Sequence, residues 1–256
     1  MELPLCPCGS NKAYENCCFK KKDTNGEPLF YKGAMFSSDS GSNWHPIPNK
    51  RFAAIIVGQS IDKYRTYAED LVIKSKLPEA LHTDFINHYG IFYQSYEQLL
   101  NSLTASHGKG VSFQTDTVEA RKNWRDYLLN GRILLDFLGL QCNKTLGLNQ
   151  DIGGLNKKKF SLLLATLEKQ GASDKHYLEI KSKLESLRED AVRFIGFRDR
   201  EKVAGDTIAE FPSIDDEFGV VMGGVIRLDA CNYDMIEFIK DSYEVIFKII
   251  LILLAI

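Results

Sequence analysis

The chain has 256 residues, of which 44% are hydrophobic, so it is long enough to bury the core of one large domain or two modest ones. Its 32 basic and 34 acidic side chains leave a formal charge of -2, which excludes an overall attraction to nucleic acid or to an anionic membrane surface. The start of the chain, MELPLCPCGS, lacks the basic and apolar segments of a signal peptide. We therefore expect a cytoplasmic protein in which thiols stay reduced.

Four of the six cysteines lie together in the segment CPCGSNKAYENCC, residues 6–18. In a reducing compartment such a cluster indicates a metal site rather than a disulfide framework. Two short cysteine pairs joined by a loop can surround one zinc ion with sulfur ligands at about 2.3 Å. Four thiolates close the coordination shell, so we expect one structural zinc per chain, with a redox switch or metal-free thiols as the alternatives. The predicted ligands are Cys6, Cys8, Cys17 and Cys18.

The residues between the two cysteine pairs fit this geometry. Gly9 can adopt the positive φ of a tight turn, and Ser10 can cap the short helical turn that carries the second pair. Lysines at position 12 and positions 20–22 would offset the negative charge of four thiolates around Zn²⁺. The same lysines form a compact basic surface to which a protein or nucleic acid could bind.

This segment resembles the SEC-C motif, a short zinc-binding element best known from the C-terminal tail of the SecA preprotein translocase ATPase. The resemblance lies in the Cys-x-Cys-Gly-Ser start, in Tyr14 and in the Cys-Cys end, and it covers about twenty residues. It implies zinc bound by the four clustered cysteines. It also implies contact with a protein partner, such as a secretion chaperone, or with ribosomes.

Residues 25–50 have the composition of a linker, with a lysine run before them, turn-forming residues and the polar tract from Ser37 to Asn43. We expect one short strand at Leu29–Lys32, and Trp44 anchoring the linker on the main domain. The predicted organisation is therefore a zinc knuckle at 1–24, a linker at 25–50 and a mainly helical domain at 51–256.

From residue 51 onward, apolar residues recur at steps of three and four, the period of amphipathic helices. One helix is predicted from about Glu79 to Leu103, and another from near Thr115 with Asp116 as its cap. A shorter helix ends at Gly171. The next helix begins at Ser173 or Asp174, and its apolar face is formed by Tyr177, Ile180, Leu184, Leu187, Ala191 and Phe194.

The helical period is lost at about 203–230, where Val and Ile become frequent and Gly223-Gly224 separates two short apolar runs, so we expect a β-rich excursion. A final helix is predicted from about Asp234 to Leu254. Its apolar end, Ile249–Ile256, is too short to cross a bilayer, because a span needs about 20 residues. We expect it in the core of the bundle or in a homodimer interface. The predicted fold is mainly α, with a zinc knuckle followed by five or six bundled helices and a small β insertion.

Familiar catalytic motifs are missing from the sequence. There is no phosphate-binding loop, no G-x-S-x-G elbow, no H-E-x-x-H helix and no dinucleotide-binding fingerprint. His82 and His88 would lie about 240° apart around one helix, so they are not predicted to bind a common ligand. Cys142 and Cys231 lie among apolar residues and are expected to be small buried side chains.

The segment from Leu187 to Ile208, LREDAVRFIGFRDREKVAGDTI, resembles the end of HEPN helical bundles, many of which cleave RNA with an Arg followed four to six residues later by His. No histidine follows Arg193, Arg198 or Arg200, so a general acid or base is lacking. The resemblance therefore implies a bundle that does not cleave. We expect these arginines to pair with neighbouring acids, namely Glu189, Glu201 and Asp206.

The sequence thus favours a zinc-binding adaptor that engages a protein or ribonucleoprotein partner through its knuckle. We assign no catalytic residue and no organic cofactor. The alternative is a ribonuclease, or a degenerate ribonuclease-like helical domain of the HEPN type.

Overall fold

The computed structural model describes residues 12–13, 16–17, 21–22, 30–38, 41–48, 64–104, 113–147, 155–203, 209–210, 213–215, 220–222, 225–228 and 231–256. The chain forms two compact units. The first comprises Met1–Asp62, Tyr96–Trp124 and Thr207–Ile239, and the second comprises Lys63–Ser95, Arg125–Asp206 and Lys240–Ile256.

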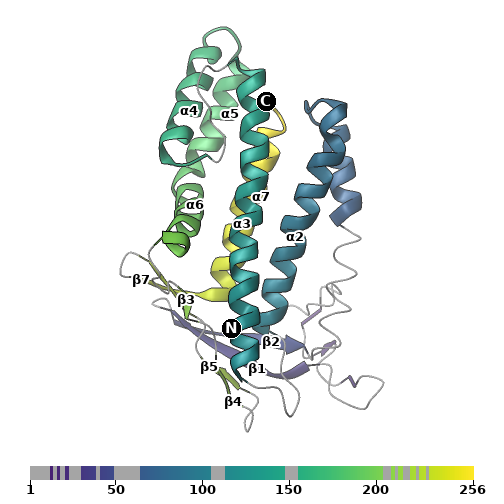
Figure 1. The fold of residues 1–256 in the computed structure, drawn as a ribbon, viewed down its shortest axis with the longest axis vertical. Helices are drawn as coiled ribbons and strands as arrows, with labels where there is room; N and C mark the ends of the chain where they lie inside the picture. The colour runs from purple at the N-terminus through teal and green to yellow at the C-terminus, as the bar shows by residue number, and fades with distance from the viewer. Residues whose placement is uncertain are drawn as a thin grey trace. The chain divides into compact units, whose positions relative to one another are not determined.

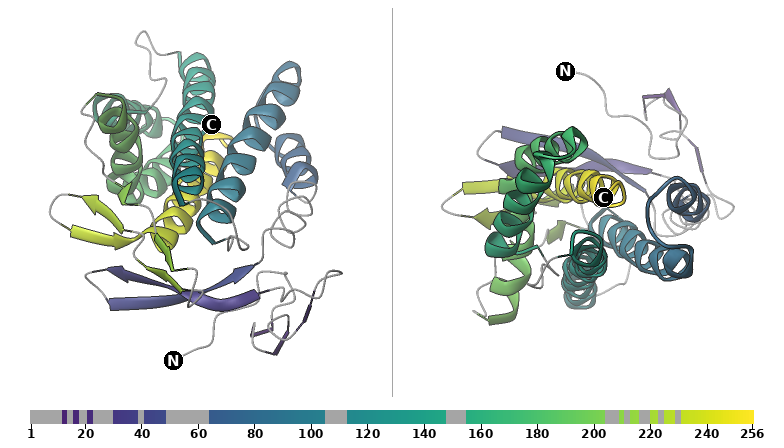
Figure 2. Two further views of the ribbon diagram at one scale, coloured as in Figure 1. Left: turned by 60° about the horizontal axis from the view of Figure 1, so that its bottom comes forward. Right: turned by 90° about the horizontal axis from the view of Figure 1, so that it is seen from above.

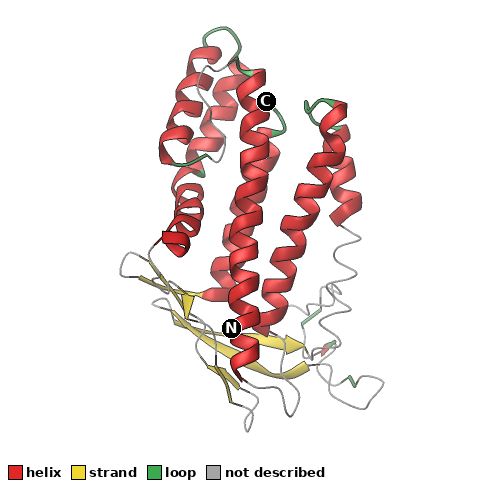
Figure 3. Ribbon diagram, in the orientation of Figure 1, coloured by secondary structure: helices red, strands yellow, loops and turns green. Residues whose placement is uncertain are grey.

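The helices carry most of the described structure (Figure 1, Figure 3). Residues 64–73 are helical, and a short 3-10 turn, η2 (Glu79–Leu81), runs into the next helix. The helices that follow are α2 (His82–Thr104), α3 (Phe113–Thr145), α4 (Lys157–Gly171), α5 (Lys175–Ser186), α6 (Arg188–Val203) and α7 (Met235–Leu253). The predicted mainly α fold is therefore confirmed.

Two sheets lie in the first unit (Figure 2). The larger has the strand order β2-β1-β5-β4, in which β1 (Phe30–Ser38) pairs antiparallel with β2 (Gly41–Pro48) and parallel with β5 (Val220–Met222). The smaller sheet is antiparallel, with the order β3-β6-β7. The remaining strands are β3 (Ala209–Glu210), β4 (Ser213–Asp215), β6 (Val225–Leu228) and β7 (Cys231–Asp234).

The strands at 209–234 agree with the predicted β-rich excursion, but β1 and β2 lie where a linker with one short strand was expected. The glycines and prolines of residues 30–48 are typical of loops, yet β1 and β2 pair with a register in which Pro46 needs no hydrogen-bonding partner. Tyr31 pairs with Ile47 and Ala34 with His45, so two residues of β1 bulge opposite this proline, which has no N–H to donate. The other neighbour of β1 in this sheet, β5, lies far along the chain, and a local sequence pattern cannot reveal the pairing of β1 with β5. The division into 1–24, 25–50 and 51–256 stays a prediction.

Helix ends differ from expectation at two places. The helix predicted to run through Leu187 is two helices. The hydrogen-bond pattern of α5 ends there, and the Leu187 N–H donates to Leu184 O at 3.1 Å. Leu187 stays near helical geometry, with φ -102° and ψ 0°, so the apolar period continues across the break. Asp174 is the cap of α5, accepting from the His176 N–H at 2.9 Å. Helix α3 begins at Phe113, so Asp116 lies inside its first turn and is not its N-cap.

Aromatic and aliphatic side chains from the helices fill the core of the second unit. The apolar C-terminal end belongs to this core: Ile249 and Ile250 are fully buried, and the Lys76 N–H donates to Leu254 O at 3.0 Å. Of the two positions expected for this segment, the core is therefore the one observed. The largest fully buried side chains of this unit are Tyr89, Tyr93, Tyr127, Phe85, Phe92, Phe160, Phe194 and Phe197.

Close packing around α3 depends on Gly131. A Cβ atom at this position would lie 2.8 Å from ring atoms of both Phe92 and Phe194, which are held in the core. Gly90, in α2, has no neighbouring atom within 4 Å of the same point. The two glycines therefore differ in what an added methyl group would meet.

We expect Gly131→Ala to lower the free energy of unfolding by about 1–3 kcal/mol, because the methyl group overpacks the core. The matched variant Gly90→Ala should raise it by about 0.5–1 kcal/mol through the better helix propensity of alanine. Urea denaturation of both variants measures the difference. Equal effects of the two substitutions would contradict the packing described here.

Candidate functional site

The cysteine segment is the first candidate site, and Cys17 is the one predicted ligand within the described residues. It is half-buried and follows a tight turn in which the Asn16 N–H donates to Ala13 O at 3.0 Å. This agrees with the short helical turn expected before the second cysteine pair. Cys6, Cys8 and Cys18 lie outside the described residues, so the full ligand set stays a prediction.

Basic side chains flank this segment. Lys12, Lys21 and Lys22 are exposed, whereas Lys20 lies outside the described residues. Exposed ammonium groups next to a negatively charged thiolate site can reduce its charge and can also face an anionic partner. In the described part of the chain, no group of three or more His, Cys, Asp or Glu side chains is placed to hold a metal ion.

The two histidines of the α2 region have separate structural contacts. His82 Nε2 lies 3.0 Å from Leu77 O, and the ring of His88 packs on Phe137 with centroids 5.2 Å apart. Each ring is therefore engaged with a different part of the helical unit.

The arginine-rich segment lies on α6, where described arginines make structural contacts. Arg193 Nη1 donates to Asp190 Oδ1 at 3.1 Å, three residues earlier on the same helix, rather than to the predicted Glu189. Arg188 Nη2 donates to Ser161 Oγ at 2.7 Å and so connects α6 with α4. The side chains of Arg198, Arg200 and the predicted partner Glu201 are not described, and the other predicted partner, Asp206, lies outside the described residues. Arg188 therefore contributes to the packing of α6 on α4, whereas Arg193 makes an exposed pair within α6.

A cluster of polar groups inside the second unit was not predicted. Consecutive residues of α7 bond to two different helices: Ser242 Oγ lies 2.8 Å from Tyr127 Oη on α3, and Tyr243 Oη lies 3.1 Å from Tyr89 Oη on α2. Both contacts are buried. Because a buried hydroxyl costs free energy unless it is hydrogen-bonded, these pairs fix how α7 lies against its neighbours.

Aromatic stacking surrounds these hydroxyl pairs. The ring of Phe92 stacks on Tyr127 and on Tyr243, each with centroids 5.5 Å apart. Tyr93 stacks on Tyr64, from the helix at 64–73, at 3.5 Å. A further polar contact joins α2 and α3, where Asn130 Nδ2 donates to Ser95 Oγ at 2.6 Å.

Burial sets the protonation of these groups. It raises the pKa of the Tyr89 and Tyr243 phenols above their ordinary value, so both remain neutral hydrogen-bonding groups. Burial also raises the pKa of the Cys142 thiol to about 12, and its S–H donates to Leu253 O at 3.6 Å. Cys142 is thus an inert core side chain, as predicted, whereas the side chain of Cys231 is not described. The cluster is suited to packing and not to proton transfer at neutral pH.

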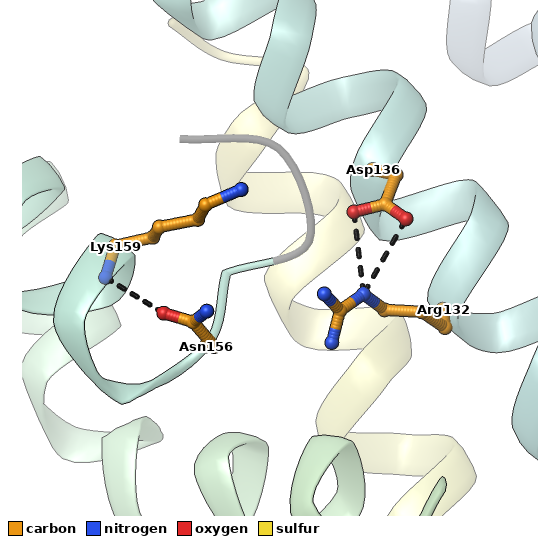
Figure 4. Close-up of polar contacts among 4 residues, drawn as sticks. All are labelled: Arg132, Asp136, Asn156 and Lys159. Atoms are coloured by element: carbon orange, nitrogen blue, oxygen red, sulfur yellow. Dashed lines mark hydrogen bonds and ion pairs between the residues drawn. The ribbon is translucent and has the colours of Figure 1, made fainter. Parts of the chain in front are cut away.

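One arginine on α3 is incompletely bonded. Arg132 Nε donates to both carboxylate oxygens of Asp136, at 3.2 and 3.4 Å, while its buried Nη1 has no hydrogen-bond partner among the described residues (Figure 4). Nearby, Asn156 caps α4 by accepting from the Lys159 N–H at 3.1 Å (Figure 4). The preceding residue, Leu155, is fully buried and has φ +43°, an uncommon backbone conformation for a residue other than glycine.

Comparison with known families agrees with the first candidate site. Residues 5–20 match the SEC-C motif, and this range contains Cys6, Cys8, Cys17 and Cys18. No curated protein and no solved structure shows significant similarity to the chain. Among the described residues, no helix combines the length and apolar character needed to span a membrane.

The hydroxyl pair of Tyr89 and Tyr243 can be tested by a double-mutant cycle. Tyr89→Phe should lower the free energy of unfolding by about 1–3 kcal/mol, because the buried hydrogen bond between the Tyr89 and Tyr243 hydroxyls is removed. Tyr243→Phe should have a similar cost. The double variant should lose about 0.5–3 kcal/mol less than the sum, which chemical denaturation can measure. Strictly additive losses would show that the two hydroxyls do not interact.

Stability should also depend on alkaline pH. In the unfolded chain a tyrosine ionises near pH 10. In the folded protein these two buried phenols are still protonated at that pH, because burial raises their pKa. The contribution of the raised pKa to stability is therefore complete below about pH 10. Above that pH, it is lost by about 1.4 kcal/mol per pH unit for each phenol. Denaturation between pH 8 and 11 should show a shallower loss for Tyr89→Phe/Tyr243→Phe than for the unaltered protein. The same slope in both proteins would contradict this assignment.

Proposed function

We propose that this chain is a zinc-binding interaction protein in which residues 1–24 form a SEC-C-like knuckle that engages a protein or ribonucleoprotein partner. The match of residues 5–20 to the SEC-C motif is the observation that carries this proposal. In it, one structural Zn²⁺ is held by Cys6, Cys8, Cys17 and Cys18. Residues 25–50 connect the knuckle to the mainly helical part, 51–256, and the protein works in the cytoplasm, where its thiols stay reduced.

The chemistry of the ligands supports a binding role for the metal. Four thiolates occupy all the tetrahedral positions of zinc, so neither a water nor a substrate can be activated at the ion. Zinc then contributes by folding a segment that is too short to have a hydrophobic core of its own. The exposed Lys12, Lys21 and Lys22 would belong to the surface that this fold presents to an anionic region of the partner.

Contacts within the helical part show how its polar groups are engaged. Its buried hydroxyls bond to one another at Tyr127–Ser242 and Tyr89–Tyr243. Arg193, in the segment that resembles HEPN bundles, pairs with Asp190, and no histidine follows it in the sequence. No described contact favours the alternative of a ribonuclease. The apolar C-terminal residues already pack in the core, so the proposal requires no homodimer through that segment.

The metal can be tested by its content per chain. We expect the purified full-length protein to contain one zinc, and Cys17→Ser to lose it because a hydroxyl is a poor substitute for a thiolate ligand. Cys142→Ser is the matched control, since this buried cysteine lies on α3 and should leave the zinc content unchanged. Mass spectrometry of the metal in all three proteins measures this. Zinc retained in full by Cys17→Ser would reject the proposed ligand set.

Partner binding should depend on the same cysteine. In affinity purification of the full-length chain from its host cells, we expect a defined protein or ribonucleoprotein to be retained by the unaltered protein and by Cys142→Ser, and lost with Cys17→Ser. Circular dichroism should show that Cys17→Ser keeps its helices, because the knuckle contributes none of α2–α7. Equal retention by Cys17→Ser would reject binding through the knuckle.

A further inference from the structure

We draw no further inference here: the strongest candidate, the Arg132 side chain on α3, whose buried Nη1 has no hydrogen-bond partner among the described residues, carries no proposal because this side chain is 15% exposed and already bound to Asp136, and no second observation points to a ligand there.

Discussion

The second unit depends on how α7 is held by the helices around it. Ser242 and Tyr243 are neighbours in the sequence, yet their hydroxyls bond to α3 and α2 respectively. A slip of α7 by one residue would break both hydroxyl pairs, at a cost of about 1–3 kcal/mol for each buried hydroxyl left unsatisfied, and it would also disturb the apolar packing. The surrounding rings and the close approach at Gly131 supply burial and shape, whereas the hydroxyl pairs select one register.

Local patterns in the sequence are sufficient to predict most of the helices. The start of α5 at Asp174 and the end of α4 at Gly171 follow from capping and period, which involve residues close together in the chain. The buried face of α2 includes two tyrosines, Tyr89 and Tyr93, beside Phe85, Phe92 and Leu99. A tyrosine is buried when another side chain can bond to its hydroxyl, and here that partner lies 154 residues away. The same limitation applies to β1, because no local pattern indicates its pairing with β5.

The candidate metal site can be proposed from the sequence for the opposite reason. All four proposed ligands lie within residues 6–18, so their spacing alone defines a shell that zinc can occupy. No long-range contact has to be inferred. The arginine segment shows the contrast, because its meaning depends on what each guanidinium contacts in three dimensions. Arg193 bonds to Asp190 within its own helix, and Arg188 bonds to Ser161 on α4.

Zinc held by a complete shell of four thiolates is the central claim of the proposed function, since this shell gives the metal a structural role. X-ray absorption at the zinc edge, measured on the full-length protein, tests it most directly. We predict four sulfur ligands at about 2.3 Å. A shell that contains nitrogen or oxygen at about 2.0–2.1 Å would contradict the claim, because it would replace at least one of Cys6, Cys8, Cys17 and Cys18 as a ligand.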